Sequence, residues 1–524
     1  MLTLSRGASE AYFLYFCRMI NLTGIARPFF CGPVLSAARS ADPAGVERVQ
    51  RSVLARLLSR GRRCEYGVRH GFGSIAGYED FAARVPLVEY EELRRDVMRM
   101  VRGGRNVLWP GVCRNFAQSS GTSGGKSKYI PVTADSLREN HYAGGSAAVA
   151  FYLNLYPDSR LFGGRSFILG GSFSNELDGL PRGVRVGDLS ASLIANINPL
   201  VNLFRVPSRR VALMADWRQK LPALVEESAG SDITNISGVP SWFLTVLRGV
   251  IERAGASVIH DVWPNLEVFF HGGIAFGPYR SQYDAITAPG RMRYIENYNA
   301  SEGFFAVQDT LEGGSMRLLT DVGVFYEFVP ADGDGQAVAA WQVEPGRVYS
   351  LVITACNGLW RYAIGDTVKI ESVEPLRISI AGRTKSFINA FGEELMVWNA
   401  DTAIEAACRQ CGAEVANYTA APVYACGGLR GRHQWFVEWA KAPACGAEAF
   451  ADVLDAGLQA VNSDYQAKRS GGIFLDRLEI VEMPTGSFDR WLASTGKLGG
   501  QRKIPRLAND RRIADALLEY LMKP

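Results

Sequence analysis

A ten-residue segment in the first quarter of the chain consists almost entirely of small, hydroxylated and basic residues. It reads Ser119-Ser-Gly-Thr-Ser-Gly-Gly-Lys-Ser-Lys128 and follows an apolar run that contains Val112 and Phe116. Small side chains let backbone N–H groups approach an anion closely, hydroxyls add donors, and lysines supply positive charge. The segment therefore indicates a phosphate-binding loop, although a polar connection that binds nothing can have the same composition.

The spacing of this loop does not fit a P-loop NTPase. That motif needs a glycine, four residues and then Gly-Lys followed by Ser or Thr. Counting back from Gly125-Lys126-Ser127 places Ser120 where the first glycine belongs. The sequence therefore disfavours a P-loop nucleotide-binding site.

Polar residues with possible chemical roles also stand in four later segments, Phe269-Phe-His-Gly-Gly273, Tyr298-Asn-Ala-Ser-Glu302, Leu359-Trp-Arg-Tyr-Ala-Ile-Gly-Asp366 and Gly500-Gln-Arg-Lys-Ile-Pro-Arg506. Glu302 offers the oxygen ligand that Mg²⁺ prefers, since this ion is usually held by one or two carboxylates plus phosphate oxygens. Each segment also fits an ordinary structural role. Ser301-Glu302 can end a buried strand, His271 can be a packed core histidine, and Asp366 can lie in a β-turn.

The elements that would position these residues alternate between helices and strands. Residues 44–60 carry apolar positions at helical spacing, and residues 78–100 repeat that pattern with many charges on the other face. Residues 266–270 and 293–298 are predicted strands that end at the loops named above. Strands that alternate with helices indicate an α/β class.

The pattern changes twice in the second half of the chain. Residues 316–370 have the alternation of a β-rich region, and the residues after about 385 combine strands and helices within a short stretch. The sequence therefore predicts an α/β fold with a large N-terminal domain of mixed sheets and a β-rich subdomain, plus a small C-terminal α+β domain. We place the N-terminal domain at residues 1–382, a hinge at 383–386 and a mobile C-terminal domain at 387–524.

Length and composition restrict the class of protein. The chain has 524 residues, whereas a domain has roughly 150, and its 47% hydrophobic content is globular. The 57 basic and 53 acidic residues leave a net charge of +4, which argues against a nucleic-acid partner. No apolar run reaches the roughly 18 residues that span a bilayer, so we expect no membrane insertion.

The cysteines predict a reducing compartment. Nine cysteines are scattered through the chain, and the pair Cys408 and Cys411 has no second close pair to complete a zinc site. The first residues do not read as a signal peptide, because Arg18 interrupts the apolar run that begins at Ala11. We therefore expect a cytoplasmic protein that is a monomer or a weak homodimer.

The loop at residues 119–128 resembles the phosphate-binding loop of adenylate-forming enzymes. Its form is most similar to that of one branch, the GH3 family of acyl acid amido synthetases, of which the chain looks like a bacterial-type member. Lys128 occupies the lysine position of that branch, while Lys126 and Ser127 replace the Glu-Pro common there. The later segments resemble the family's other motifs in the correct order, from about residue 85 to 515.

The resemblance implies a role for each matching residue. It implies that Lys128 holds phosphate together with the loop residues Ser119, Ser120, Gly121, Thr122 and Ser123, that Ser301 lies near the α-phosphate, and that Glu302 holds Mg²⁺. For the nucleoside, it implies that Gly272 and Gly273 carry adenine, on which Tyr298 stacks, and that Asp366 accepts the ribose hydroxyls. It further implies that Arg383 reaches ribose or phosphate, that Lys385 stands at the hinge, and that Lys503 enters the site on the ATP oxygens.

The implied activity is a two-step ligase reaction that uses ATP and Mg²⁺. A carboxylic acid is converted to an acyl-adenylate, and an amine, expected to be an amino acid, then takes the acyl group. The acid pocket is expected around residues 136–151 and near Ser172 and Ser237, where Tyr142, Phe151, Tyr152, Trp242 and Phe243 supply aromatic surface or plain core. Three alternatives stay open: an acyl-CoA synthetase of the same fold, a non-catalytic nucleotide-binding protein, and a structural or interaction protein.

Overall fold

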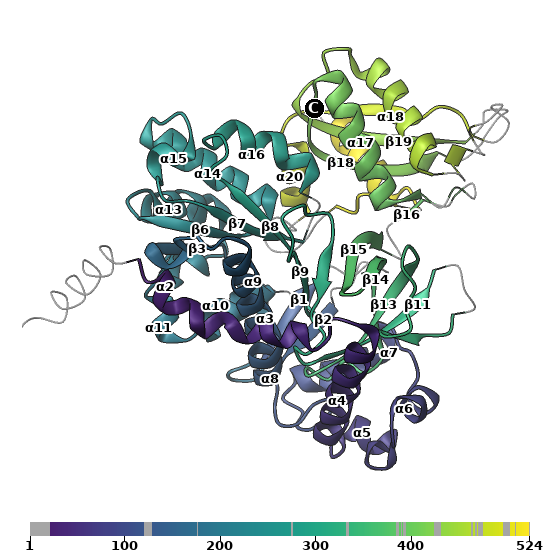
Figure 1. Cartoon of the computed structure of the whole chain (residues 1–524). Coiled ribbons are helices and arrows are strands. Elements are labelled where there is room, and N and C mark those ends of the chain that lie inside the picture. Colours follow the sequence, from purple (N-terminus) through teal and green to yellow (C-terminus); the bar gives the residue numbers. More distant parts are fainter. Residues whose placement is uncertain are drawn as a thin grey trace, which may run out of the picture.

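The computed structural model of the chain has a mixed α/β architecture (Figure 1). The structure describes residues 21–119, 128–175, 177–273, 276–331, 335–383, 387–388, 390, 393, 395–423, 431–462, 465–466, 469, 475–495, 504–508 and 510–522. Among them, no helix is long and apolar enough to cross a membrane. The predicted combination of helices with mixed sheets is confirmed.

One long sheet organises the larger part of the chain. Within the described residues it has twelve strands, in the order β12 (Val338–Ala339), β11 (Val324–Pro330), β13 (Val348–Ala355), β14 (Tyr362–Val373), β15 (Leu376–Arg383), β10 (Met316–Leu318), β9 (Gly303–Val307), β8 (Arg293–Ala300), β7 (Val268–Gly272), β6 (Ile233–Gly238), β3 (Arg165–Ile168) and β5 (Arg205–Val206). The strands from β5 to β8 pair in parallel, and those from β8 to β12 pair antiparallel.

Strand β8 is therefore the place where the topology of the sheet reverses. It pairs in parallel with β7 on one side and antiparallel with β9 on the other. In open α/β sheets, ligands bind outside the carboxyl ends of the strands at such a switch point. The residues that follow β6, β7 and β8 are thus placed where a ligand is expected.

The parallel strands are covered by helices on both faces, as their continuous burial requires. Helices α13 (Trp217–Ala229), α14 (Pro240–Ala254) and α16 (Arg280–Ile286) share a core with this half of the sheet, which includes Phe167, Ile236, Phe243, Phe269 and Tyr283. Helix α9 (Tyr142–Leu155) packs in a separate core with Phe270, Ile295 and Phe304. Buried apolar surface on both faces fixes the register of the strand ends.

The antiparallel half packs on helices from the start of the chain. Helix α4 (Pro43–Gly61) begins with Asp42, whose carboxylate accepts a hydrogen bond from the Gly45 N–H at 2.6 Å, and with proline at its first position. Its buried face joins a core with α6 (Tyr78–Arg84), α7 (Tyr90–Val101) and the strands β11, β13 and β14. A three-stranded sheet of β1 (Asn115–Ser119), β2 (Lys128–Val132) and β4 (Arg185–Gly187) stands beside it.

The last part of the chain forms its own sheet and its own core (Figure 1, top right). Strands β18 (Glu414–Val423), β19 (Arg432–Lys441) and β20 (Glu479–Met483) combine with helices α17 (Val397–Cys411), α18 (Ala447–Val461), α20 (Ser487–Ser494) and α21 (Arg512–Met522). A core that contains Ile404, Tyr418, Trp435, Phe450 and Leu454 holds most of them together. The division of the chain at residues 383–386 stays a prediction, and residues 384–386 lie outside the described residues.

Candidate active site

A cavity of about 2430 Å³ opens at the carboxyl ends of the parallel strands. We call it the central cavity. Its wall includes residues at or just after the ends of β6, β7 and β8, among them Ser237, Gly272, Gly273, Ser301 and Glu302. Asp366 on β14 and residues of the C-terminal sheet also line it. The central cavity therefore lies at the switch point of the sheet and brings together segments that are far apart in sequence.

The segment predicted to bind phosphate begins at the end of β1 and ends at the start of β2 in the small sheet. In the antiparallel ladder of β1 and β2, Ser119 and Lys128 are registered partners, so the loop leaves and returns at one place. Ser120, Gly121, Thr122 and Ser123 lie outside the described residues. The Lys128 ammonium donates to the Tyr362 hydroxyl at 3.4 Å and lies 5.8 Å from the centre of the Tyr90 ring.

Tyr362 links two of the residues that the sequence singled out. Its hydroxyl, fully buried at the start of β14, hydrogen-bonds Glu302 and accepts from Lys128. Burial, followed by the charge of Glu302, raises the pKa of Tyr362 well above its usual value. The phenol therefore stays protonated and can donate to the Glu302 carboxylate while it accepts from the lysine. Tyr362 lies within the segment Leu359–Asp366, but its sequence context predicts no role for it.

Arg361 explains why Tyr362 is held so firmly. Its guanidinium makes a buried ion pair with Glu327 at 2.8 Å and donates to the carbonyls of Ala82 at 2.7 Å and Val85 at 2.6 Å. Its φ of 43° lies in the left-handed region, which is strained for a residue with a side chain. Arg361 thus turns into the helical layer, and the next residue, Tyr362, contacts Lys128 and Glu302.

Tyr298 and Asp366 are also in contact, although Tyr298 lies on β8 and Asp366 lies on β14. The buried Tyr298 hydroxyl donates to the Asp366 carboxylate at 2.7 Å, and the Tyr298 ring packs edge-on against Phe305 at 5.0 Å between centroids. Asp366 is the register partner of Arg383 in the ladder of β14 and β15. Only the backbone of Arg383 is described. Lys385 and Lys503 lie outside the described residues.

Gly272, the last residue of β7, and Gly273 line the central cavity. A Cβ at Gly272 would come within 2.3 Å of the Asn297 carbonyl oxygen, and Gly273 has a φ of 80°. Side chains are therefore excluded at Gly272 by space and disfavoured at Gly273 by conformation. His271, just before them, stacks on Phe276 at 4.3 Å. Burial lowers the pKa of His271 to about 3, so it is a packed, neutral histidine.

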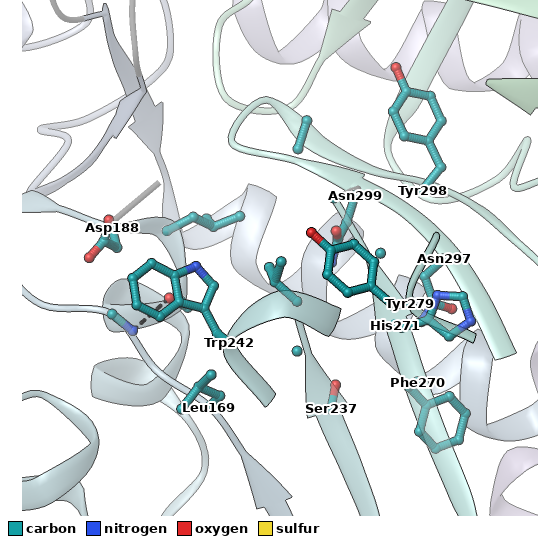
Figure 2. Close-up of a pocket in the computed structure, with 18 of the residues that line it drawn as sticks. Leu169, Asp188, Ser237, Trp242, Phe270, His271, Tyr279, Asn297, Tyr298 and Asn299 are labelled. Carbon is teal, nitrogen blue, oxygen red and sulfur yellow. Dashed lines mark hydrogen bonds between the residues drawn. The ribbon is translucent and has the colours of Figure 1, made fainter. Parts of the chain in front are cut away.

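The expected acid pocket divides into cavity wall and core. Tyr142 and Trp242 line the central cavity, whereas Phe151, Tyr152 and Phe243 are buried in the cores around α9 and α14. Figure 2 shows the indole of Trp242 between Asp188 and Ser237, with Leu169 below it. Some of the aromatic residues expected from the sequence thus line the cavity and others fill the core, and only their position in the fold distinguishes the two groups.

Comparison with known proteins identifies the family. Residues 44–291 match the GH3 family N-terminal domain, residues 317–383 the GH3 family central domain, and residues 398–512 the GH3 family C-terminal domain. The chain belongs to the GH3 family.

Curated relatives of this GH3 protein are plant enzymes. It is 24% identical over 552 residues to the indole-3-acetic acid-amido synthetase GH3.8 of Oryza sativa subsp. indica, with 90% of each chain covered. It is 25% identical over 391 residues to the indole-3-acetic acid-amido synthetase GH3.4 of Arabidopsis thaliana, where the match spans 62% of this chain and 64% of the relative.

Solved structures share its fold. The AtGH3.15 acyl acid amido synthetase in complex with 2,4-DB superposes with a TM-score of 0.75 at 18% identity, covering 94% of this chain and 96% of that one. A 2-hydroxyisobutyryl-CoA ligase in the postadenylation state superposes with a TM-score of 0.57 at 14% identity, covering 89% and 91%. The expected adenylate-forming fold is thereby confirmed.

One wall of the central cavity in this GH3 protein comes from the C-terminal sheet. The Arg506 guanidinium lies 4.4 Å from the centre of the Tyr418 ring and hydrogen-bonds the Tyr279 hydroxyl of the large sheet's helical layer. The Tyr418 hydroxyl donates to Asp401 at 2.6 Å, and the Tyr279 hydroxyl donates to the Ala416 carbonyl at 3.4 Å. These contacts join the two parts of the chain beside the cavity.

Proposed function

We propose that this GH3 protein is an acyl acid amido synthetase. It adenylates a carboxylic acid with ATP and transfers the acyl group to an amine, which we take to be an amino acid. The observation that carries the proposal is the position of Glu302 and Asp366 on the wall of a cavity at the switch point of the sheet, with Glu302 joined to Lys128 through the buried Tyr362 hydroxyl behind that wall. The three matched GH3 domains and the named activity of the relatives support it.

In the first step, a carboxylate oxygen of the acid attacks the α-phosphorus of ATP. The bond from that phosphorus to the bridging oxygen breaks, and pyrophosphate leaves with the electron pair. Negative charge builds on the phosphates, and donors aimed at that charge lower the barrier. The backbone and hydroxyls of residues Ser119–Ser123, the Lys128 ammonium and Lys503 are assigned this role, with Ser301 close to the α-phosphate.

The residues present fit a Mg²⁺ ion on the phosphates. Glu302 is 6% exposed and is part of the wall of the central cavity, where we propose that ATP binds. Among the described residues no group of three or more acidic, histidine or cysteine side chains could hold a metal alone. Mg²⁺ suits such a site, because it takes one or two carboxylates and completes its shell with phosphate oxygens and water. When bound, the ion would neutralise phosphate charge.

The remaining assigned residues hold the nucleoside. The open backbone at Gly272 and Gly273 suits a flat adenine ring, and Tyr298 closes that subsite. Asp366 can accept hydrogen bonds from both ribose hydroxyls through its two carboxylate oxygens. Arg383, opposite Asp366 in the ladder, reaches the ribose or phosphate, and Lys385 marks the hinge.

In the second step, the amine nitrogen attacks the acyl carbonyl carbon and AMP leaves with the electron pair of the broken C–O bond. The nitrogen releases a proton to a base, and an amide remains. No side-chain nucleophile is needed, because the mixed anhydride already activates the carbonyl, so positioning accounts for most of the rate. The central cavity has space for this, since at about 2430 Å³ it exceeds the roughly 300–1,000 Å³ of single-ligand pockets.

A cytoplasmic location and a monomeric or weakly dimeric state belong to the same proposal. The seven cysteines in the described part of the chain are free thiols, which supports a reducing compartment. Light scattering across a range of protein concentrations measures the oligomeric state. The partners proposed are the acid and the amine as small molecules, with no nucleic acid and no membrane.

The test is pyrophosphate release from ATP and Mg²⁺ with a panel of carboxylic acids. Each acid is assayed alone, with the twenty amino acids, and with coenzyme A as a separate arm. Wild type should release pyrophosphate only with particular acids and faster with particular amino acids, with an amide as product. Glu302→Ala should lose at least 10²-fold in rate. The matched control is Glu252→Ala, which changes an exposed carboxylate on α14 away from the central cavity.

Other outcomes would overturn the proposal. Stimulation by coenzyme A alone, with a thioester product, would make the chain an acyl-CoA synthetase. Measurable ATP binding without pyrophosphate release for any acid would favour a non-catalytic nucleotide-binding protein. Absence of ATP binding would leave a structural or interaction role.

A further inference from the structure

Lys220 is a buried cation with an unusual set of partners. It lies in α13 at the wall of the central cavity, with only 3% of its surface exposed. Its ammonium donates to the carbonyl oxygens of Gly170 at 2.5 Å, Met214 at 3.2 Å and Gly171 at 3.5 Å. An ammonium has three N–H donors, so these three carbonyls account for all of them.

The burial of this ammonium carries a cost. In the described part of the chain, no carboxylate lies within ion-pair distance of the Lys220 ammonium, and Asp188 acts on it only through longer-range charge. Burial lowers the pKa of Lys220 to about 8. An apolar side chain of similar length would avoid the cost of desolvating a charge. The role that the contacts support for the ammonium is therefore to hold the three carbonyl groups in place.

Two of the three carbonyls, those of Gly170 and Gly171, belong to a short segment that is clamped from the other side as well. We call residues 170–172, which follow β3, the Gly-Gly-Ser segment. The Gly171 N–H donates to the Ser190 hydroxyl at 2.8 Å, and the Ser172 N–H donates to the Asp188 carboxylate at 2.7 Å. Lys220 thus holds the carbonyls of the segment, while residues at the start of α10 (Leu189–Asn196) hold its amides.

Close packing leaves the Gly-Gly-Ser segment no space for side chains at its glycines. A Cβ at Gly170 would come within 2.4 Å of the Ile194 side chain, and one at Gly171 within 2.2 Å of the Asp188 carboxylate. The whole segment lines the central cavity beside Leu169 and Trp242. A shift of this backbone would therefore change the shape of the wall that Trp242 completes (Figure 2).

We propose that Lys220 is a positioning residue for the acid substrate, acting through the Gly-Gly-Ser segment rather than by contact with the acid. The proposal rests on the proposed function, since it assigns this wall to the acid pocket. The nucleotide residues Glu302, Asp366 and Lys128 are held by separate contacts with Tyr362 and Tyr298. Loss of the ammonium should therefore weaken acid binding and spare ATP binding.

The test compares Lys220→Met with wild type and with Lys369→Met. Methionine keeps most of the length of lysine without the charge, and Lys369 is an exposed lysine on β14, paired with Glu371. With an acid that wild type accepts, Lys220→Met should raise the KM for the acid at least tenfold. The KM for ATP and kcat at saturating acid should each change less than threefold. Lys369→Met should match wild type throughout.

Hydrogen exchange supplies a readout that does not depend on turnover. The amides of residues 169–173 should exchange faster in Lys220→Met than in wild type, while those of β7 and β8 keep their rates. If wild type turned over no acid, the proposed function would fail, and exchange would still decide whether Lys220 orders the segment. If Lys220→Met folds poorly, Ser190→Ala takes its place. This variant removes only the acceptor of the Gly171 amide, and it should give a smaller change of the same kind.

Two results would overturn the proposal. One is an unchanged KM for the acid together with unchanged exchange at residues 169–173. The other is an equal loss in acid binding, ATP binding and kcat in both Lys220→Met and Ser190→Ala, because that pattern would indicate a general loss of folded protein.

Discussion

At the residue scale, the candidate site depends on a phenol that no local pattern would have singled out. Tyr362 stands between Lys128 and Glu302 and contacts both. The lysine is the first residue of β2 in the three-stranded sheet and the glutamate follows β8 in the long sheet, so their meeting is a product of the fold. The hydroxyl fixes the spacing of a cation and an anion, and the anion, Glu302, lines the central cavity.

Tyr362→Phe should therefore slow adenylation without unfolding the protein. The ring is kept, so packing is conserved, and a lost hydrogen bond costs roughly 1 kcal/mol of stability. Acid-dependent pyrophosphate release should fall at least tenfold, because Lys128 and Glu302 lose their common partner. The matched control is Tyr349→Phe, a buried tyrosine on β13 whose hydroxyl accepts from the Glu344 amide away from the central cavity. Equal rates in both variants would rule out a role for the Tyr362 hydroxyl.

At the scale of elements, the π turn Leu137–His141 places a histidine where it must stay neutral. Asn140 of this turn donates to the carbonyls of Phe304 and Val322 and accepts from the Phe304 amide, which docks the turn on β9. His141 follows it and is 5% exposed, and burial lowers its pKa to about 4. The unfolded chain titrates near 6.5, so between pH 6.5 and 4 it binds more protons than the folded chain.

Stability should therefore fall as the pH drops through that window. At pH 4.5 the penalty from His141 is about 2.5 kcal/mol of unfolding free energy, since each unit of pKa difference is worth about 1.4 kcal/mol. His141→Asn removes this penalty, so its unfolding midpoint in urea should move less than that of wild type between pH 7 and 4.5. His70→Asn, a half-buried control in the loop after α5 (Glu65–Arg69), should follow wild type more closely. A His141→Asn midpoint that falls in parallel with wild type would contradict this.

The elements also show what could be predicted from the sequence and what could not. Periodicity located β7, β8 and α4 within a few residues, because each buries a regular apolar face. The helical pattern at residues 78–100 proved to be two helices, α6 and α7, since Pro86 stands between them and cannot continue a helix. Neither the π turn nor the buried ion pair of Arg361 with Glu327 has a local signature.

The candidate site divides in the same way. The motifs placed Gly272, Glu302 and Asp366 on the central cavity. Gly272 ends β7 and Glu302 follows β8, whereas Asp366 lies within β14. Their partners come from distant strands and helices, so Tyr362, His141 and Lys220 required the fold. The glycines of the Gly-Gly-Ser segment were visible as glycines, but only packing shows that Asp188 and Ile194 occupy the space beside them.

At the scale of the whole molecule, one side of the central cavity is closed by a contact between the two parts of the chain, the large sheet with its helices and the C-terminal part. Tyr279 comes from the helical layer of the large sheet, and Arg506 lies three residues after Lys503 in the C-terminal part. The guanidinium is held by the Tyr418 ring and by the Tyr279 hydroxyl. That hydroxyl also donates to the Ala416 carbonyl at 3.4 Å, so one phenol oxygen serves two contacts across the interface.

Tyr279→Phe should therefore affect the two half-reactions differently. Loss of the hydroxyl removes both contacts and lets the C-terminal part leave this arrangement more readily, while the ring still fills its buried site. If adenylation takes place in this arrangement, acid-dependent pyrophosphate release should slow by about threefold to tenfold, corresponding to roughly 1 kcal/mol. Amide formation from a separately prepared acyl-adenylate should keep its rate or rise. Tyr326→Phe, whose buried hydroxyl donates to the Leu319 carbonyl far from the interface, serves as the control. Equal slowing of both half-reactions would show that the contact supports the fold and not one arrangement of its parts.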